Sequence, residues 1–107
     1  MTNDDLPELY QFLGAYFHQD WMCEFDLADE VVSSFVEDSD ELTTQQVLKE
    51  IEILLGSNLT ENNLRDFLLK EMSCSYCYWN EWASGEIWLR HIEKKLNDSL
   101  ADPHLHR

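Results

Sequence analysis

Tyr16-Phe17-His18-Gln19-Asp20-Trp21 is the stretch on which we expect the fold to depend, because it places three aromatic rings, an imidazole and a carboxylate in six residues. Residues 9–13 precede it with apolar side chains at helical spacing. Residues 23–41 follow it and are acidic, without a single Lys or Arg. We therefore predict that the rings pin the end of the first helix into the core, while His18 and Asp20 fix the turn.

Apolar periodicity and capping residues predict helices along most of the chain. Pro7 suits the first turn of a helix, where its missing N–H costs nothing. Thr43 and Gln46 form a capping-box pattern, and Gly56 is suited to the left-handed cap at the end of the same helix. Thr60 is a preferred N-cap residue for the next one. The predicted helices span residues 7–17, 26–37, 43–56, 60–72 and 86–98.

Each predicted helix carries an apolar face that a core would bury. The faces of the second, third and last helices contain Leu27, Val31 and Phe35; Val47, Leu48, Ile51, Leu54 and Leu55; and Trp88, Leu89, Ile92 and Leu96. The irregular stretch 73–82 is rich in Tyr and Trp, whose rings we also expect in the core. The chain is therefore predicted to be all-α, a single compact bundle of five to six short helices. One domain would cover 1–107, with a frayed tail at 102–107.

The charge of the chain is large and uneven. Twenty-two acidic residues against seven basic ones give a formal net charge of −15. Residues 1–48 contain twelve Asp or Glu and no Lys or Arg, whereas all seven bases lie in residues 49–107. A negative field repels nucleic acids and anionic membranes and steers a basic partner towards the protein. The charge therefore favours a basic protein partner over direct nucleic-acid or membrane binding.

The sequence also predicts a cytoplasmic protein. Residues 1–5 lack the positive charge and the apolar run of a signal peptide, and no stretch contains eighteen consecutive apolar residues. Three cysteines, an odd number, argue against a closed set of disulfides and fit a reducing compartment.

Two cysteines have the spacing of a zinc-ligand pair. Cys74 and Cys77 are separated by two residues, and His104 and His106 are a conceivable second pair. Those histidines lie in the expected tail, and no βαβ pattern supports a redox motif. We interpret the thiols as apolar packing residues and predict neither a metal nor another cofactor.

A second pattern raises the possibility of acid-base chemistry. The carboxylate of Asp20 is close enough in sequence to orient the imidazole of His18. However, the chain contains only three glycines, no phosphate-binding loop and no GxSxG motif. We therefore assign His18 and Asp20 a structural role and predict no catalytic residue.

The acidic segment contains charges that oppose local helix energetics. Asp26 and Glu30 are four residues apart on one predicted helix, where like charges cost about 0.2–0.5 kcal/mol. Glu37 and Asp38 lie near its C-terminus, where the helix dipole disfavours anions by about 0.3–1 kcal/mol each. Unfavourable local choices of this kind indicate a functional surface, although a solvated acidic face is the alternative.

The chain resembles the helical immunity proteins of bacterial contact-dependent growth inhibition systems. The resemblance is carried mainly by Leu9-Tyr10-Gln11-Phe12-Leu13-Gly14-Ala15-Tyr16-Phe17-His18-Gln19-Asp20-Trp21, which is similar to an N-terminal signature of that family. Trp88-Leu89-Arg90 is similar to the aryl-Leu sequence of a late helix in that family. The resemblance implies a cytoplasmic antitoxin without catalytic activity that binds a delivered toxin domain, in this branch a ribonuclease. A ribonuclease binds phosphates and is basic, which agrees with an acidic inhibitor.

Our leading hypothesis is a stoichiometric immunity protein that binds its toxin through the acidic segment. The predicted contact residues are Glu24, Asp26, Asp29, Glu30, Glu37, Asp38, Asp40 and Glu41. Tyr16, Phe17, His18, Asp20 and Trp21 are predicted to be scaffold. The alternatives are a small zinc-dependent or His/Asp-dependent enzyme, and an acidic helical adaptor or nucleic-acid mimic.

Overall fold

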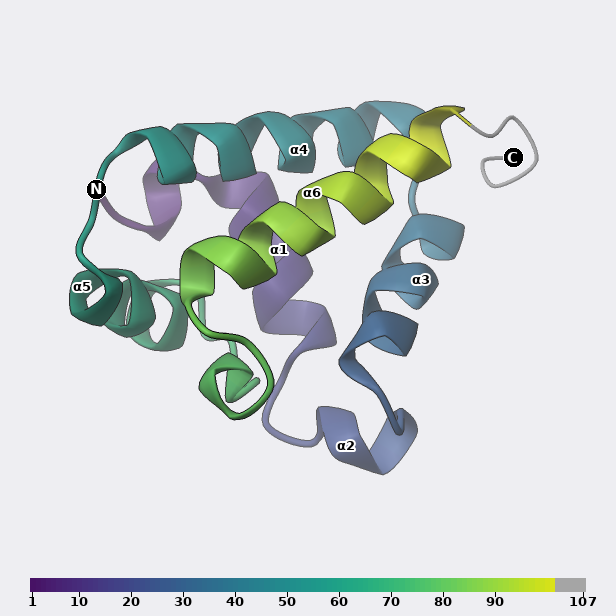
Figure 1. Cartoon of the computed structure of the whole chain (residues 1–107). Helices are drawn as coiled ribbons and strands as arrows, with labels where there is room; N and C mark the ends of the chain where they lie inside the picture. The colour runs from purple at the N-terminus through teal and green to yellow at the C-terminus, as the bar shows by residue number, and fades with distance from the viewer. Residues whose placement is uncertain (102–107) are drawn as a thin grey trace.

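Helix α4 (Glu41–Gly56) forms one long edge of the molecule, and the other helices are arranged on its inner side (Figure 1). The computed structural model describes residues 1–101, which contain helices but no strand, so the predicted all-α fold is confirmed. None of these helices is long and apolar enough to span a membrane. The other elements are η1 (Asn3–Asp5), α1 (Pro7–Tyr16), α2 (Trp21–Glu24), α3 (Ala28–Asp38), α5 (Glu61–Asp66), η2 (Phe67–Glu71), η3 (Tyr78–Asn80) and α6 (Gly85–Ala101).

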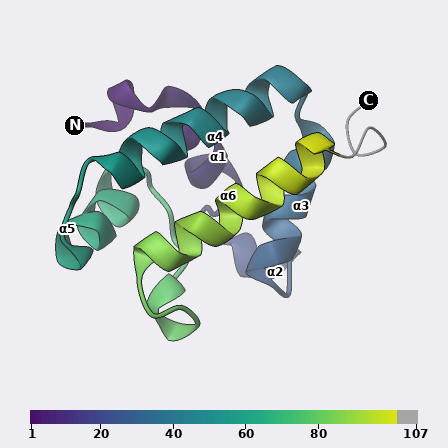
Figure 2. The same cartoon turned by 45° about the horizontal axis from the view of Figure 1, so that its top comes forward.

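Helices α1, α4 and α6 form the centre of the core. Helix α4 contacts both of the others, and α3 closes the bundle against α1 and α6. Figure 2 shows α4 and α6 alongside each other, with their chains running in opposite directions. Most side chains of the apolar faces predicted for α1, α4 and α6 are buried: Leu9, Phe12 and Leu13; Val47, Ile51 and Leu54; Trp88, Leu89, Ile92 and Leu96. Tyr16 on α1 and Leu48 and Leu55 on α4 are only partly buried.

A buried carboxylate joins α4 to the start of α1. Glu50 is 2% exposed, and its Oε1 accepts a hydrogen bond of 2.9 Å from the backbone N–H of Leu9. Its Oε2 accepts a second bond of 2.9 Å from Nε2 of Gln46. The first N–H groups of a helix have no partner within the helix, and the helix dipole favours a negative charge there. Glu50 therefore caps α1 from a neighbouring helix.

An aromatic cluster holds the end of α1 against α6. Phe17, Trp21, Tyr76, Tyr78 and Trp88 are all buried. The ring of Phe17 lies 5.6 Å from each of the rings of Trp21, Tyr76 and Trp88, measured between centroids. The backbone N–H of Ser75 also donates to the Phe17 carbonyl, at 2.8 Å. The prediction that these aromatic side chains belong to the core is thus confirmed for the five rings.

Helix α4 differs from the prediction at both of its ends. Helix α4 begins at Glu41 rather than after Thr43, because the side chain of Asp40 accepts from the Thr43 N–H at 2.7 Å and serves as the N-cap. Gly56 does not adopt a left-handed conformation. The helix continues through it, and Asn58, with φ of 57°, makes the reversal. Asn is among the residues that tolerate this region.

Leu27 is exposed, although the sequence predicts that it is buried. Helix α3 begins at Ala28, so Leu27 occupies the extended N-cap position and lies outside the helical face that turns inward. The remaining predicted residues of that face, Val31 and Phe35, are buried.

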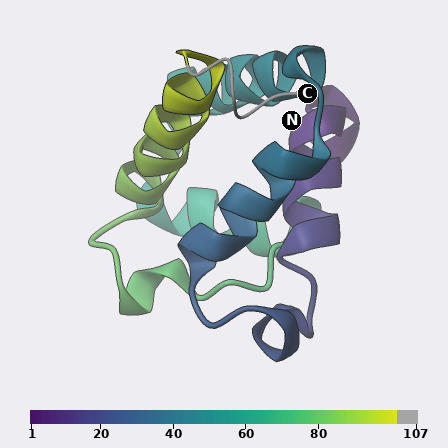
Figure 3. The ribbon, with the colours of Figure 1, turned by 90° about the vertical axis from the view of Figure 1, so that its right-hand side faces the viewer.

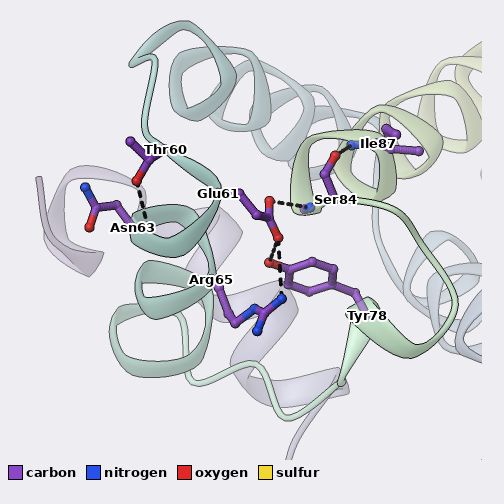
Figure 4. A network of polar contacts seen from close by, with 8 residues as sticks. Thr60, Glu61, Asn63, Arg65, Tyr78, Ser84 and Ile87 are labelled. Atoms are coloured by element: carbon purple, nitrogen blue, oxygen red, sulfur yellow. Dashed lines mark hydrogen bonds and ion pairs between the residues drawn. The ribbon is translucent and has the colours of Figure 1, made fainter.

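Helix α5 and the start of α6 are joined by a polar network around Glu61 (Figure 4). The Glu61 carboxylate accepts from the Tyr78 hydroxyl at 2.6 Å and from the Gly85 N–H at 2.9 Å. Arg65 extends the network and lies with its guanidinium carbon 4.4 Å from the centroid of the Trp79 ring. Burial and the bond to Glu61 raise the pKa of Tyr78 to about 12. Thr60 caps α5 as predicted, but the helix widens into the π-helical turn η2 before Met72.

Candidate protein-binding surface

The acidic segment forms one outer face of the molecule. Figure 3 views this face: α3 crosses the front, and α2 lies below it. The first turn of α4 follows directly after α3. The face is therefore built from three consecutive elements, and residues 22–42, which span it, contain no Lys or Arg. We call residues 22–42 the acidic face.

The predicted scaffold residues lie at the edge of this face. Phe17 and Trp21 are buried in the aromatic cluster. The backbone N–H of Asp20 donates to Nδ1 of His18 at 3.1 Å, while His18 Nε2 lies 3.1 Å from Glu24 Oε2. Since Nδ1 accepts, the proton of the neutral ring resides on Nε2 and points to Glu24. His18 thus fixes the turn together with the backbone of Asp20, and the carboxylate that it meets is that of Glu24.

Several of the predicted contact carboxylates also stabilise the fold. Glu30 Oε1 accepts from the backbone N–H groups of Asp26 and Leu27, at 3.1 and 2.9 Å, and so caps α3. Asp29 Oδ1 lies 2.9 Å from Nε2 of His91 on α6. With the Asp40 cap on α4, three of these side chains occupy favourable helix-terminal or paired positions. The penalty expected between Asp26 and Glu30 is therefore offset by the cap that Glu30 makes.

Asp38 has a similar local partner at the far end of α3. Its Oδ2 accepts a hydrogen bond of 2.9 Å from the hydroxyl of Tyr16. Burial, followed by this bond and the negative charge of Asp38, raises the pKa of Tyr16 to about 12. The bond offsets part of the cost of an anion at the C-terminus of α3 and links the acidic face to α1.

Two predicted carboxylates remain exposed without such a role. The side chains of Asp26 and Glu37 make no hydrogen bond or ion pair with any residue of 1–101. Glu37 borders a shallow hollow of about 410 Å³ beside α3, whose wall includes the half-buried ring of Phe25 and the carboxylates of Asp29 and Glu30. An aromatic ring surrounded by carboxylates offers a suitable environment for a cationic side chain.

Sequence reasoning missed the apolar part of this face. Met22, Leu27 and Leu42 are strongly exposed, although Leu27 was assigned to the core. Leu42 lies in the first turn of α4, five residues before the first buried valine of that helix, Val47. Leu27 could not be identified from the sequence, because side chains with an acceptor oxygen are strongly preferred at the N-cap position that it occupies.

The zinc site considered as an alternative is not assembled within the described residues. Cys74 is buried, which raises its thiol pKa to about 12, whereas Cys77 is exposed. No group of three or more His, Cys, Asp or Glu side chains suited to a metal occurs in residues 1–101. His104 and His106, the second half of the conceivable zinc site, lie outside the described residues, as does the tail expected to fray.

Comparison with known proteins points to one family. Residues 5–96 match the family of CdiI immunity proteins. A chain in the crystal structure of a CdiA-CT/CdiI complex from Y. kristensenii 33638 is 39% identical to this one, with a TM-score of 0.85. The match covers 89% of this chain and 96% of that chain. No curated protein sequence matches significantly.

Proposed function

Because the chain belongs to the CdiI immunity protein family, we propose that it binds and neutralises the toxin domain of a CdiA-type protein. The observation that carries this proposal is the likeness, over nearly all of both chains, to a chain solved in a complex of CdiA-CT with CdiI. Inhibition by stoichiometric binding in the cytoplasm requires no catalytic residue, cofactor or metal in the immunity protein.

The charge of the chain supports a basic toxin. A formal charge of −15, with no Lys or Arg in residues 1–48, produces a field that accelerates association with a positively charged partner. A ribonuclease is positively charged at its substrate-binding surface, because that surface must bind RNA phosphates. We propose that the toxin is a ribonuclease and that carboxylates of the inhibitor occupy positions that phosphates would otherwise take.

The acidic face is the surface that we assign to this contact. All eight predicted carboxylates lie on it: Glu24, Asp26, Asp29, Glu30, Glu37, Asp38, Asp40 and Glu41. Asp26 and Glu37 are the best placed for direct pairing, because neither is used by the fold within residues 1–101. The hollow beside Glu37 and Phe25 would receive an Arg or Lys side chain of the toxin.

Growth rescue tests the function itself. We would look for a reading frame upstream of this gene that ends in a toxin domain, induce that domain in cells with or without the chain, and follow growth and RNA integrity. We expect growth to be restored and RNA to stay intact with the chain present. Continued growth arrest would contradict the function, whereas rescue from a toxin that leaves RNA intact would contradict only the ribonuclease assignment. The CdiA-CT domain of Y. kristensenii 33638 serves as a non-cognate control.

Charge reversal tests the assigned surface. Asp26→Lys with Glu37→Lys should slow association with the toxin domain and reduce its dependence on salt, because steering charges are lost. Glu52→Lys with Asp66→Lys is the matched control: both residues are exposed outside the acidic face, and the net charge changes equally. Equal effects of the two pairs on the association rate would exclude a localised acidic contact.

A further inference from the structure

The most exposed large apolar side chains are concentrated on the acidic face. Leu42 is 76% exposed, Met22 72% and Leu27 61%, and no other large apolar side chain within residues 1–101 exceeds the 50% of Met1. Exposed apolar side chains scattered over a surface require no explanation. Here the three largest exposed fractions occur within residues 22–42, a segment of 21 residues that contains no Lys or Arg. Two independent properties therefore coincide in residues 22–42.

From this coincidence we infer that Met22, Leu27 and Leu42 are the apolar anchors of the toxin-binding surface, with the carboxylates arranged around them. The inference rests on the proposed function, and the partner is the same basic toxin domain. Its complementary surface would carry apolar recesses bordered by Lys or Arg side chains. Protein interfaces are commonly built in this way, from a few desolvated anchors within a polar rim.

Leu27 provides the clearest case, because its side chain neither caps the helix nor is buried in the core. It stands at the N-cap of α3, where Ser, Thr, Asp or Asn would satisfy a helix N–H and Leu does not. The carboxylate of Glu30 compensates by accepting from the N–H groups of Asp26 and Leu27. A residue that is unfavourable both for capping and for exposure is expected where binding requires it.

The anchors are held by buried neighbours and local bonds. Met22 follows Trp21, whose ring is buried 5.6 Å from that of Phe17, so α2 is fixed to the aromatic cluster. Leu42 follows the Asp40 cap and lies in the first turn of a sixteen-residue helix. An interface on rigid elements loses less conformational entropy on binding. The backbone of the acidic face should therefore change little when the toxin binds.

Anchors and charges should affect different rate constants. Steering charges control the association rate and its salt dependence, whereas desolvated anchors control how long a complex lasts. The combined substitution Met22→Ala, Leu27→Ala and Leu42→Ala should accelerate dissociation of the toxin domain at least tenfold. The association rate and its salt dependence should stay within twofold of the wild-type values.

The matched control is Ile53→Ala with Ile87→Ala. These side chains are 47% and 45% exposed and lie in the later part of α4 and the first turn of α6, outside the acidic face. Dissociation should change less than twofold in this variant. Thermal unfolding of both variants verifies that the fold is intact, and Leu27→Gln alone provides a second, milder test that should accelerate dissociation about threefold or more.

The outcomes separate the inference from the function on which it rests. A wild-type chain that binds the toxin, together with a folded triple variant that dissociates at the wild-type rate, would overturn the anchors and leave the function standing. Equal acceleration in the triple variant and the control would also overturn them. A wild-type chain that does not bind its CdiA-type toxin domain would overturn the proposed function.

Discussion

The aromatic cluster and the acidic face are adjacent in the chain but have opposite characters. Trp21 is 6% exposed and Met22 72%, so the chain passes from core to surface in one step. In the cluster the rings contact one another, and Phe17 alone lies within 6.2 Å of four other rings, centroid to centroid. On the acidic face, large apolar side chains and carboxylates point outward instead. Helix α2 thus contains both a residue that stabilises the fold, Trp21, and one that remains available for a partner, Met22.

This contrast indicates how a buried core positions an exposed surface. Burial of large rings provides the main free energy of folding, because the hydrophobic effect scales with apolar area removed from water. The acidic face is held to the buried interior by the apolar side of α3, which includes Val31 and Phe35, and by polar contacts such as Tyr16 with Asp38 and His91 with Asp29. The composition of its exposed positions can therefore be selected for binding, provided that these contacts remain.

Removing a ring from the cluster should produce the largest effect. Trp21→Ala leaves a cavity beside Phe17 and Tyr76 and should lower the free energy of unfolding by about 3–5 kcal/mol. Urea denaturation measures this. Trp82→Ala is the control, because that ring is only partly buried, and it should cost clearly less. A Trp21→Ala protein that unfolds like the wild type but no longer binds the toxin would instead place Trp21 in the interface.

The core was largely predictable from the sequence because helical periodicity is a local signal. The buried faces of α1, α4 and α6 follow from spacings within single helices, and most of their predicted members are buried. The start of α3 was not predictable in this way. Moving it to Ala28 transfers Leu27 from the core to the surface, since periodicity identifies a face only once the helix start is known.

The binding surface was only partly predictable, for a related reason. The absence of Lys and Arg from residues 1–48 can be read from the sequence, and it directed attention to the acidic face. Contacts between distant residues cannot be read in this way. Glu50 lies 41 residues from Leu9, and Asp29 lies 62 from His91, so the structure was needed to distinguish carboxylates used by the fold from Asp26 and Glu37.

The next largest effect should come from the buried carboxylate. Glu50→Ala leaves the Leu9 N–H without its acceptor and removes a negative charge from the start of α1. An unsatisfied buried donor costs about 1–3 kcal/mol, so we expect unfolding free energy to fall by that amount. Gln46→Ala is the control, since Glu50 keeps its bond to Leu9. If both variants unfold alike in urea, the cap on α1 contributes no measurable stability.

Leu27→Ser should separate stability from binding. Serine at the N-cap of α3 can accept from a first-turn N–H, which should raise the free energy of unfolding by about 0.5–2 kcal/mol. The same change removes an apolar anchor and should accelerate toxin dissociation. Urea denaturation and dissociation kinetics on one protein sample measure both. Leu42→Ser is the control, because Leu42 lies inside α4 and its replacement offers no cap. Faster dissociation from a less stable Leu27→Ser protein would contradict this separation.

Tyr16→Phe should have the smallest effect, because it removes only the hydrogen bond to Asp38 that joins α1 to the acidic face. Near neutral pH we expect the free energy of unfolding, measured by urea denaturation, to fall by about 0.5–1.5 kcal/mol.

The Tyr16 pKa is raised from 10.0 to about 12, first by burial and then by Asp38. Its contribution is thus present below pH 10 and declines as the pH rises to 12, because the unfolded state releases its proton first. The difference between wild type and variant should therefore vanish over this range. Both proteins should still lose stability there, because Tyr78, whose pKa is also raised to about 12, is present in each. No difference near neutral pH would mean that the ring packing of Tyr16, which phenylalanine retains, rather than its hydroxyl, connects the two regions.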